Sequence, residues 1–393
     1  TEAALLWDHD LTPTTSLNSY VSLYRFSSPR FRPTSFPINS NFLGGEGDFR
    51  VGALGQSYFE GNKFEVQTAL NTQISPGQTL SFGLNFTEDR NYQQESRGVA
   101  FLDRTIARSS AFLIDDISFS PQLKANLGLR YTYSTQFGVV ATPAVGLRYS
   151  PSRLVSLRAN WSQVFNAPSI ADLFVAGGIF RPNPALRPET GITYDLGVDV
   201  TPQPNLAFRA TYFNTYLDGA IGTFVFRNPD PADPNLFLQQ QRNLDSRRAS
   251  GIEFTGDWQV AEHLRVRAVW TNTDARNFGP VDSSDNTLFF YQYQDLNIPF
   301  NRVTLAVSYA ERGVNATLLG RYSGGQRRGE DPFGVPARAT LDLNVDVPLT
   351  PFLTLSASVF NLTDTSYEYT AGVPAPGTTF RVGGRFSLGQ DAP

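Results

Sequence analysis

The residue types that carry most enzyme chemistry are scarce in this chain of 393 residues. Cysteine is absent, which excludes a thiol nucleophile, and the two histidines, His9 and His263, stand far apart in the sequence. A catalytic triad or a metal centre needs side chains that converge on one point, and no spacing around either histidine suggests this. The acid pair Asp115 and Asp116 lies in a strand-like segment, where neighbouring side chains point to opposite faces. We therefore predict no catalytic residue, no metal site and no cofactor, and interpret the chain as a protein that is not an enzyme.

Aromatic residues offer a different chemistry, because their flat faces bind apolar or planar ligands. They gather in two long polar segments, near residues 165–189 and 274–299. The residues that we predict to contact a ligand are Phe165, Phe174, Phe180, Phe289, Phe290, Tyr291 and Tyr293. An aromatic girdle at the membrane interface, or packing within the loops, would explain the same residues without a ligand, and this alternative stays open.

Arginine supplies almost all of the positive charge, since Lys63 and Lys124 are the only lysines. Several arginines fall on the polar face of predicted strands, namely Arg130, Arg148, Arg158, Arg381 and Arg385. They could balance acids on the same face, such as Asp342 and Asp346, or form a basic track for an anionic chelate. The sequence does not separate these two interpretations. The formal net charge of -4 argues against a nucleic-acid-binding protein, which would carry a basic stripe.

A period of two in hydrophobicity predicts the elements that position these residues. Residues 79–87, 123–134 and 339–347 alternate apolar and polar side chains over nine to twelve positions. Such segments are long enough to cross a bilayer as tilted strands. The mean hydropathy of -0.25 is compatible with this, because a transmembrane strand exposes only alternate residues to lipid. The predicted orientations are lipid-facing for Leu80, Phe82, Leu127 and Leu129, and luminal for Asn85, Asn126 and Arg130.

Short and long connections alternate between the predicted strands. The short ones lie near residues 11–14, 75–78, 120–122, 150–153, 201–205, 261–263, 311–313 and 349–352. The long ones lie near residues 28–60, 88–107, 165–189, 217–244, 274–299, 323–337 and 363–377, with a brief exception at 135–138. Outer-membrane barrels have short periplasmic turns and long external loops, whereas a soluble sandwich has no reason for this alternation. We therefore predict an all-β fold, an antiparallel transmembrane β-barrel with about seventeen strands in this chain.

Five segments, in this order, resemble the TonB-dependent receptors, which are active transporters of Gram-negative outer membranes. They are residues 110–133, 165–200 (containing FNAPSIADLF, NPALRPET and YDLGVDV), 209–222, 247–258 and 359–388. The resemblance implies a multi-pass receptor in the cell outer membrane that binds and imports a ferric siderophore or a similar large, scarce solute. It also implies as partners the ferric chelate, outer-membrane lipid and the TonB-ExbB-ExbD energy-coupling system, which acts through an N-terminal region.

The resemblance covers most of the chain, but two family features lie outside it. Family members carry an N-terminal plug domain, and large transporters of this type have roughly 22 strands. If the last strand, at 378–388, descends to the periplasm, strand parity makes the Ala3–Asp8 strand descend as well and places Thr1 outside the cell. We therefore expect residues 1–393 to be the C-terminal part of the barrel domain. On this hypothesis the 378–388 strand does not pair with Ala3–Asp8.

Two other classes of protein remain as alternatives. A passive porin would share the barrel architecture but would have no plug domain and usually one loop folded inward. A soluble all-β binding protein is the third class, and the alternating loop lengths oppose it. The residues do not distinguish iron chelates, cobalamin, nickel complexes and sugars as the solute.

Overall fold

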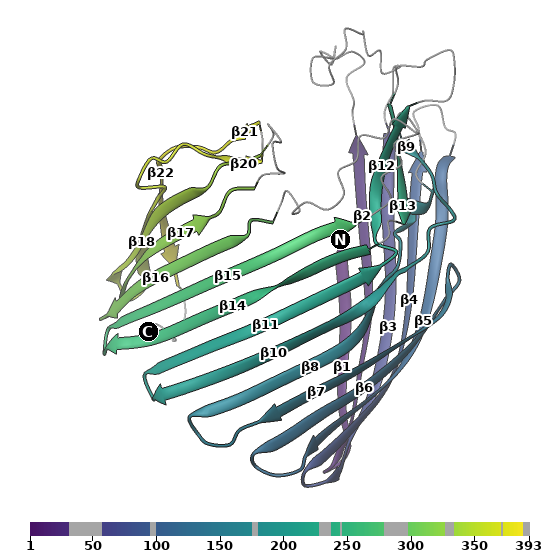
Figure 1. Cartoon of the computed structure of the whole chain (residues 1–393), viewed down its shortest axis with the longest axis horizontal. Helices are drawn as coiled ribbons and strands as arrows, with labels where there is room; N and C mark the ends of the chain where they lie inside the picture. The colour runs from purple at the N-terminus through teal and green to yellow at the C-terminus, as the bar shows by residue number, and fades with distance from the viewer. Residues whose placement is uncertain are drawn as a thin grey trace.

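Strands form nearly all of the regular structure in the computed structural model. It describes residues 1–30, 57–94, 100–174, 180–227, 237–243, 246–278, 298–326, 334–370 and 372–387. Within these ranges, one antiparallel sheet contains 17 strands and curves like the wall of a barrel (Figure 1). No helix in the described part of the chain is long and apolar enough to cross a membrane. The predicted all-β fold and strand number are confirmed.

The strands of the large sheet follow the chain, each pairing with the one before it. In spatial order they are β1 (Glu2–Thr12), β2 (Thr15–Arg30), β3 (Ser57–Ser75), β4 (Gln78–Gln94), β5 (Ala100–Ser118), β6 (Leu123–Ser134), β7 (Gly138–Tyr149), β8 (Val155–Asn166), β10 (Glu189–Gln203), β11 (Leu206–Asp218), β14 (Ser246–Ala261), β15 (Leu264–Phe278), β16 (Asn301–Glu311), β17 (Val314–Ser323), β18 (Arg338–Thr350), β19 (Leu353–Phe360) and β22 (Thr379–Phe386). Sequential antiparallel pairing means that neighbours are joined by hairpins, as expected for an up-and-down barrel.

The remaining elements are short and lie in the long connections. They are α1 (Ile170–Phe174), β9 (Phe180–Arg181), β12 (Ile221–Arg227), β13 (Phe237–Asn243), β20 (Glu368–Thr370) and β21 (Val373–Pro374). The hairpin β12–β13 adds β9 as a parallel third strand, and β20 pairs with β21. Both small sheets stand at the long-loop end of the barrel wall (Figure 1). We call this end the mouth; in outer-membrane barrels the end with the long loops faces the outside of the cell.

All eight predicted short turns are confirmed, but one predicted loop is wrong. Residues 88–107 were expected as a loop, whereas β4 and β5 extend through most of that range. Residues 88–94 of β4 are nearly all polar, and the apolar Leu102 and Ile106 of β5 lie on the inner face. The usual alternation, with apolar residues on the outer face, is therefore absent from this range. On one face the Arg90 guanidinium donates hydrogen bonds of 3.0 and 2.9 Å to Asp103 and holds the pKa of that carboxyl below its usual range. The hairpin therefore continues as a polar extension beyond the apolar part of the wall.

The side chains of the wall alternate as predicted. Leu127 on β6 is 43% exposed, and Phe82 and Leu129 are similarly exposed on the same outer face. On the inner face, Asn126 donates a hydrogen bond of 2.6 Å to Asp116. Apolar residues at the exposed face and hydrogen-bonded polar residues at the other match a wall with lipid on one side and a wet lumen on the other.

Inner-face polar groups are joined across several strands. Tyr20 donates a hydrogen bond of 2.5 Å to Glu65, and the Asn85 amide donates to the same carboxylate at 3.2 Å. The Arg130 guanidinium reaches Asn85 at 3.4 Å and lies 5.5 Å from the centre of the Phe112 ring. These contacts link β2, β3, β4, β5 and β6, so the predicted luminal positions of Asn85 and Arg130 are confirmed. The network fixes the rotamers of the inner wall without burying an apolar core.

The large sheet has two edges in the described structure. β1 pairs with β2, and β22 pairs with β19, and no pairing joins β1 to β22 among these residues. Both edge strands run from the mouth to the turn end, so direct pairing between them would be parallel. Barrels of this type are antiparallel and have an even number of strands. The prediction that the last strand does not pair with the Ala3–Asp8 strand is confirmed.

Leu127→Arg tests the orientation of the wall. A charge on the lipid-facing side near mid-bilayer should lower the free energy of unfolding by about 2–4 kcal/mol, because it loses its hydration there. The matched control is Asn126→Lys, which places a charge on the opposite face, beside Asp116, and should be nearly neutral. Denaturant titration of the barrel in phospholipid bilayers measures both variants. Equal destabilisation by the two substitutions would contradict this orientation.

Candidate functional site

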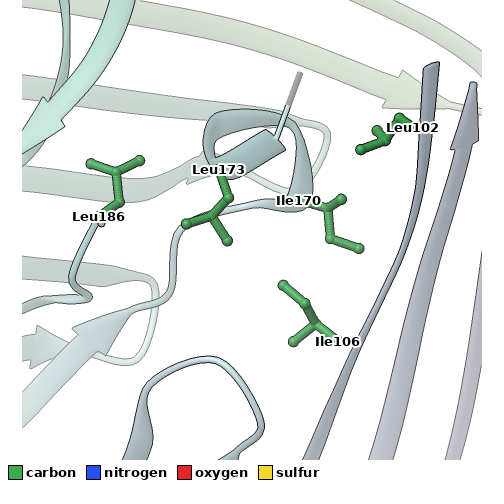
Figure 2. Packing of buried hydrophobic residues seen from close by; sticks show 5 residues of the cluster. All are labelled: Leu102, Ile106, Ile170, Leu173 and Leu186. Carbon is green, nitrogen blue, oxygen red and sulfur yellow. The ribbon is translucent and has the colours of Figure 1, made fainter. Parts of the chain in front are cut away.

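The long connection after β8 folds back onto the inner face of β5. Ile170 and Leu173 of α1, together with Leu186, pack against Leu102 and Ile106 of β5, and all five side chains are buried (Figure 2). β6 and β7 lie between β5 and β8, and the connection passes beside the hairpin that joins them, since Gln136 and Phe137 line one cavity with residues 167–170. The turn of that hairpin, residues 135–137, is short compared with the long connections at this end of the sheet. Its brevity leaves room for α1, which seals part of the mouth.

Local sequence explains why a helical turn forms here. The Ser169 hydroxyl accepts a hydrogen bond from the Asp172 amide at 3.1 Å, and the Asp172 carboxylate accepts from the Ser169 amide at 3.0 Å. This reciprocal arrangement is a capping box, which satisfies the free amides at the start of a helix. Pro168 immediately precedes it, where it cannot disturb an intrahelical hydrogen bond. The turn directs Leu173 into the apolar cluster.

The segment from Asn183 to Glu189 joins α1 to the β12–β13 hairpin. The Asn183 amide donates to the Gln241 carbonyl at 2.8 Å. Asn243 accepts from the Arg187 amide at 3.0 Å and donates to the Arg187 carbonyl at 2.9 Å. The proline-rich stretch thus finds its hydrogen-bond partners on β13, in place of the partners that a strand ladder would provide. These hydrogen bonds hold the stretch in position.

Glu189 is the buried polar residue on which three elements of the mouth converge. Glu189 is the first residue of β10, and it is only 4% exposed. One carboxylate oxygen accepts from the Asn166 amide of β8 at 2.7 Å, and the other accepts from the Ile221 backbone amide of β12 at 2.5 Å. A buried carboxylate is stable only with such donors. Sequence reasoning missed this residue, although its place directly before a strand and after a proline-rich loop was visible.

The three described aromatic candidates occupy separate places. Phe165 packs edge-on against Phe137, with ring centres 5.7 Å apart. Phe174 packs beside the apolar cluster, and the Arg104 guanidinium lies 5.2 Å from its ring centre. Phe180 is half exposed. None of the ring contacts among the described residues joins two of these three side chains. The other four candidates, Phe289, Phe290, Tyr291 and Tyr293, lie outside the described residues.

Phe180 lines a small cavity at the mouth. The cavity has a volume of about 190 Å³ and lies among α1, β9, β12 and β13. Its other polar walls come from Asp172, Arg181 and the glutamines Gln239, Gln240 and Gln241. One aromatic face with amide and charged groups around it can position a polar ligand by hydrogen bonds while the ring supplies contact area.

Several inner-wall arginines balance acids on the same face, as the first of the two sequence interpretations has it. Asp342 pairs with Arg321, and Asp346 accepts a hydrogen bond of 2.5 Å from Ser356. Arg158 pairs with Asp199 at 2.9 Å, and Arg209 contacts the other oxygen of the same carboxylate at 2.6 Å. Cross-strand register decides these partners, because Asp199 lies opposite Arg209 on β11 and two residues from the position opposite Arg158 on β8.

Comparison with known proteins decides the family. The family model described as TonB dependent receptor-like, beta-barrel matches residues 1–362. The chain belongs to this family. The predicted resemblance is therefore confirmed, and the proteins of this family that it matches are transport receptors rather than enzymes.

Individual relatives of this TonB-dependent receptor are distant. It is 23% identical over 319 residues to the vitamin B12 transporter BtuB of Vibrio vulnificus, covering 81% of this chain and 46% of that protein. It is 27% identical over 291 residues to the metal-pseudopaline receptor CntO of Pseudomonas aeruginosa, covering 65% of this chain and 36% of that protein. The chain thus spans less than half the length of these relatives.

A solved structure similar to this TonB-dependent receptor is the ferric enterobactin receptor PfeA of Pseudomonas aeruginosa, with a TM-score of 0.79 and 17% identity. The superposition covers 98% of this chain and 61% of that one. At this level of identity the likeness shows the shared barrel fold.

Glu189→Ala tests the anchoring of the mouth. The substitution leaves the Asn166 amide and the Ile221 backbone amide without an acceptor, at a cost of about 1–3 kcal/mol for each buried donor. We expect faster amide hydrogen exchange across residues 167–174 and 221–227, measured by mass spectrometry. Glu189→Gln keeps a carbonyl acceptor and should have a smaller effect, and Glu262→Ala at an exposed turn should have none. Unchanged exchange in Glu189→Ala would show that the carboxylate does not hold these elements.

Proposed function

We propose that this chain is the barrel part of an outer-membrane receptor that binds a ferric siderophore or a similar large, scarce solute and imports it with TonB-coupled energy. The family match over residues 1–362 carries the proposal. The anchored mouth adds support, because a capture site needs loops held in one arrangement before the ligand arrives. The relatives' names include a vitamin B12 transporter and a metal-pseudopaline receptor, which supports a metal chelate as the proposed solute.

The proposal places this wall in the outer membrane of a Gram-negative-type bacterium. Lipid covers the exposed apolar face, and the energy-coupling system TonB-ExbB-ExbD acts through a plug and an N-terminal region outside residues 1–393. Further strands complete the barrel between β1 and β22. An odd number of them gives each edge an antiparallel neighbour, and a barrel of roughly 22 strands needs about five in addition to these 17.

Ligand contact in this proposal falls on exposed aromatic residues at the mouth. Phe180 is one of them, because its ring borders the small cavity among α1, β9, β12 and β13. The loop aromatics Phe289, Phe290, Tyr291 and Tyr293 are proposed as further contacts. Phe165 and Phe174 act differently, since their rings pack against other residues and shape the mouth.

A passive porin is the second candidate function, and binding distinguishes it. A receptor binds its solute saturably, whereas a diffusion channel conducts ions and small solutes without high-affinity binding. The measurement is equilibrium binding of ferric siderophores and cobalamin to the full-length protein, with planar-bilayer conductance alongside. We expect saturable binding of one chelate and no steady open conductance. Large conductance without binding would establish the porin instead.

Phe180→Ala tests the proposed contact. Loss of one stacked ring should weaken chelate binding by about 1 kcal/mol, which is roughly fivefold in Kd. Phe386→Ala is the matched control, because that ring is exposed on the outer face of β22 and cannot reach a ligand at the mouth. Equal affinity in the two variants would remove Phe180 from the site.

A further inference from the structure

A second and larger cavity lies on the inner face near the mouth, away from Phe180. Its volume is about 520 Å³, within the range of small-molecule sites. Its walls are the external ends of β16, β17, β18, β19 and β22, and the connection between β19 and β22 borders it. Four arginines line it, Arg302, Arg321, Arg338 and Arg381. We call this cavity the arginine basin.

The arginine basin has a surplus of positive charge. Asp342 is the one acid among its lining residues, and its side chain is only 5% exposed. One of its oxygens pairs with Arg321, and the other accepts from the Asn361 backbone amide at 2.8 Å. The carboxylate is therefore already engaged and does not neutralise the other three arginines.

Those three guanidinium groups keep free hydrogen-bonding capacity. Within the described part of the chain, the guanidinium groups of Arg302 and Arg381 form neither a hydrogen bond nor an ion pair. Arg381 lies 5.5 Å from the centre of the Phe360 ring. Arg338 donates to the Glu368 carbonyl at 2.9 Å. A guanidinium has five N–H donors, so this single bond leaves most of its donors available.

A rigid turn holds the border of the basin. Asn361 adopts a φ of 54°, in the left-handed region, and its side chain accepts from the Thr365 amide at 3.0 Å while donating to the Thr365 carbonyl at 2.9 Å. Asp364 accepts from the Thr378 amide at 3.0 Å, which ties the start of the connection to its end. The basin is thus formed before any ligand binds.

Aromatic rings stand beside the arginines. Tyr367 lies 5.1 Å from the Arg338 guanidinium, and its ring packs edge-on against Tyr369 at 5.5 Å. Burial raises the pKa of the Tyr367 hydroxyl, so this group stays protonated and adds no negative charge. Flat rings among guanidinium groups suit a ligand that is both planar and anionic, because stacking and charge-assisted hydrogen bonds act together.

We propose that the arginine basin binds the oxyanion groups of a negatively charged metal chelate, such as one with catecholate or carboxylate arms. The inference rests on the proposed function, because it assigns a charge class to the imported solute. Anionic chelates would be selected over neutral ones by Arg302, Arg338 and Arg381. Electrostatic attraction of this kind weakens as salt screens it.

The test uses the full-length receptor with the double substitution Arg302→Gln/Arg381→Gln. Neither side chain has an acid partner in the described structure, so their removal leaves the wall's ion pairs intact. Arg209→Gln is the matched control, since that arginine is also on the inner face and Asp199 keeps Arg158. We expect the double variant to bind a triply charged ferric tris-catecholate at least tenfold more weakly at low salt. Binding of a neutral ferric trihydroxamate should not change.

Citrate, measured by calorimetry, separates this inference from the proposed function. If citrate binds the wild type but not the double variant while neither ferric chelate binds, the basin is an anion site and the import proposal fails. If the trihydroxamate binds and neither anionic probe does, the receptor proposal stands and the basin inference is overturned. Equal affinity of wild type and double variant for the tris-catecholate also overturns it.

Discussion

Backbone hydrogen bonds between neighbouring strands are the constraint on which the rest of this structure depends. Lipid offers no partner for an amide or a carbonyl, so every residue in the membrane must be paired across strands. Once the ladder is fixed, side chains must alternate between lipid and lumen, as Leu127 and Asn126 do. Polar side chains that could bind a ligand are then confined to the inner face and to the mouth. The cavity beside Phe180 and the arginine basin both lie there.

The mouth solves a problem that the wall does not have. Its connections leave the strand ladder and must find other partners for their backbone groups. Side chains supply them, since the Asn243 side chain accepts a hydrogen bond from the Arg187 amide and the Asn361 side chain accepts one from the Thr365 amide. Glu189 links this loop structure to the wall, since it starts β10 and binds groups from β8 and β12. The loops can therefore hold a binding surface in place without belonging to the sheet.

The sequence predicted the parts of the fold that depend on local pattern. A period of two located the strands and their lipid-facing sides, and turn residues located the short connections, because both signals are carried by neighbouring residues. Pairings that depend on register were not predictable, which is why Arg321 was missed as the partner of Asp342. The extension of β4 and β5 was missed because β4 is polar on both faces there, whereas β5 places the apolar Leu102 and Ile106 on its inner face. The aromatic candidates were named by type alone, and type does not say that Phe174 packs inward while Phe180 stays exposed.

The brief connection between β6 and β7 constrains how receptors of this kind can diverge. External loops of barrels ordinarily tolerate insertion, because they carry little of the fold's stability. Here Gln136, Phe137 and Ile170 line one cavity of about 280 Å³, so added length in this hairpin would first fill that space and then press on α1. Receptors that keep the packed helical turn should therefore keep this hairpin short, whereas the other loops can lengthen. The β6–β7 turn and α1 should therefore change together in evolution, even where the other connections of the mouth differ in sequence.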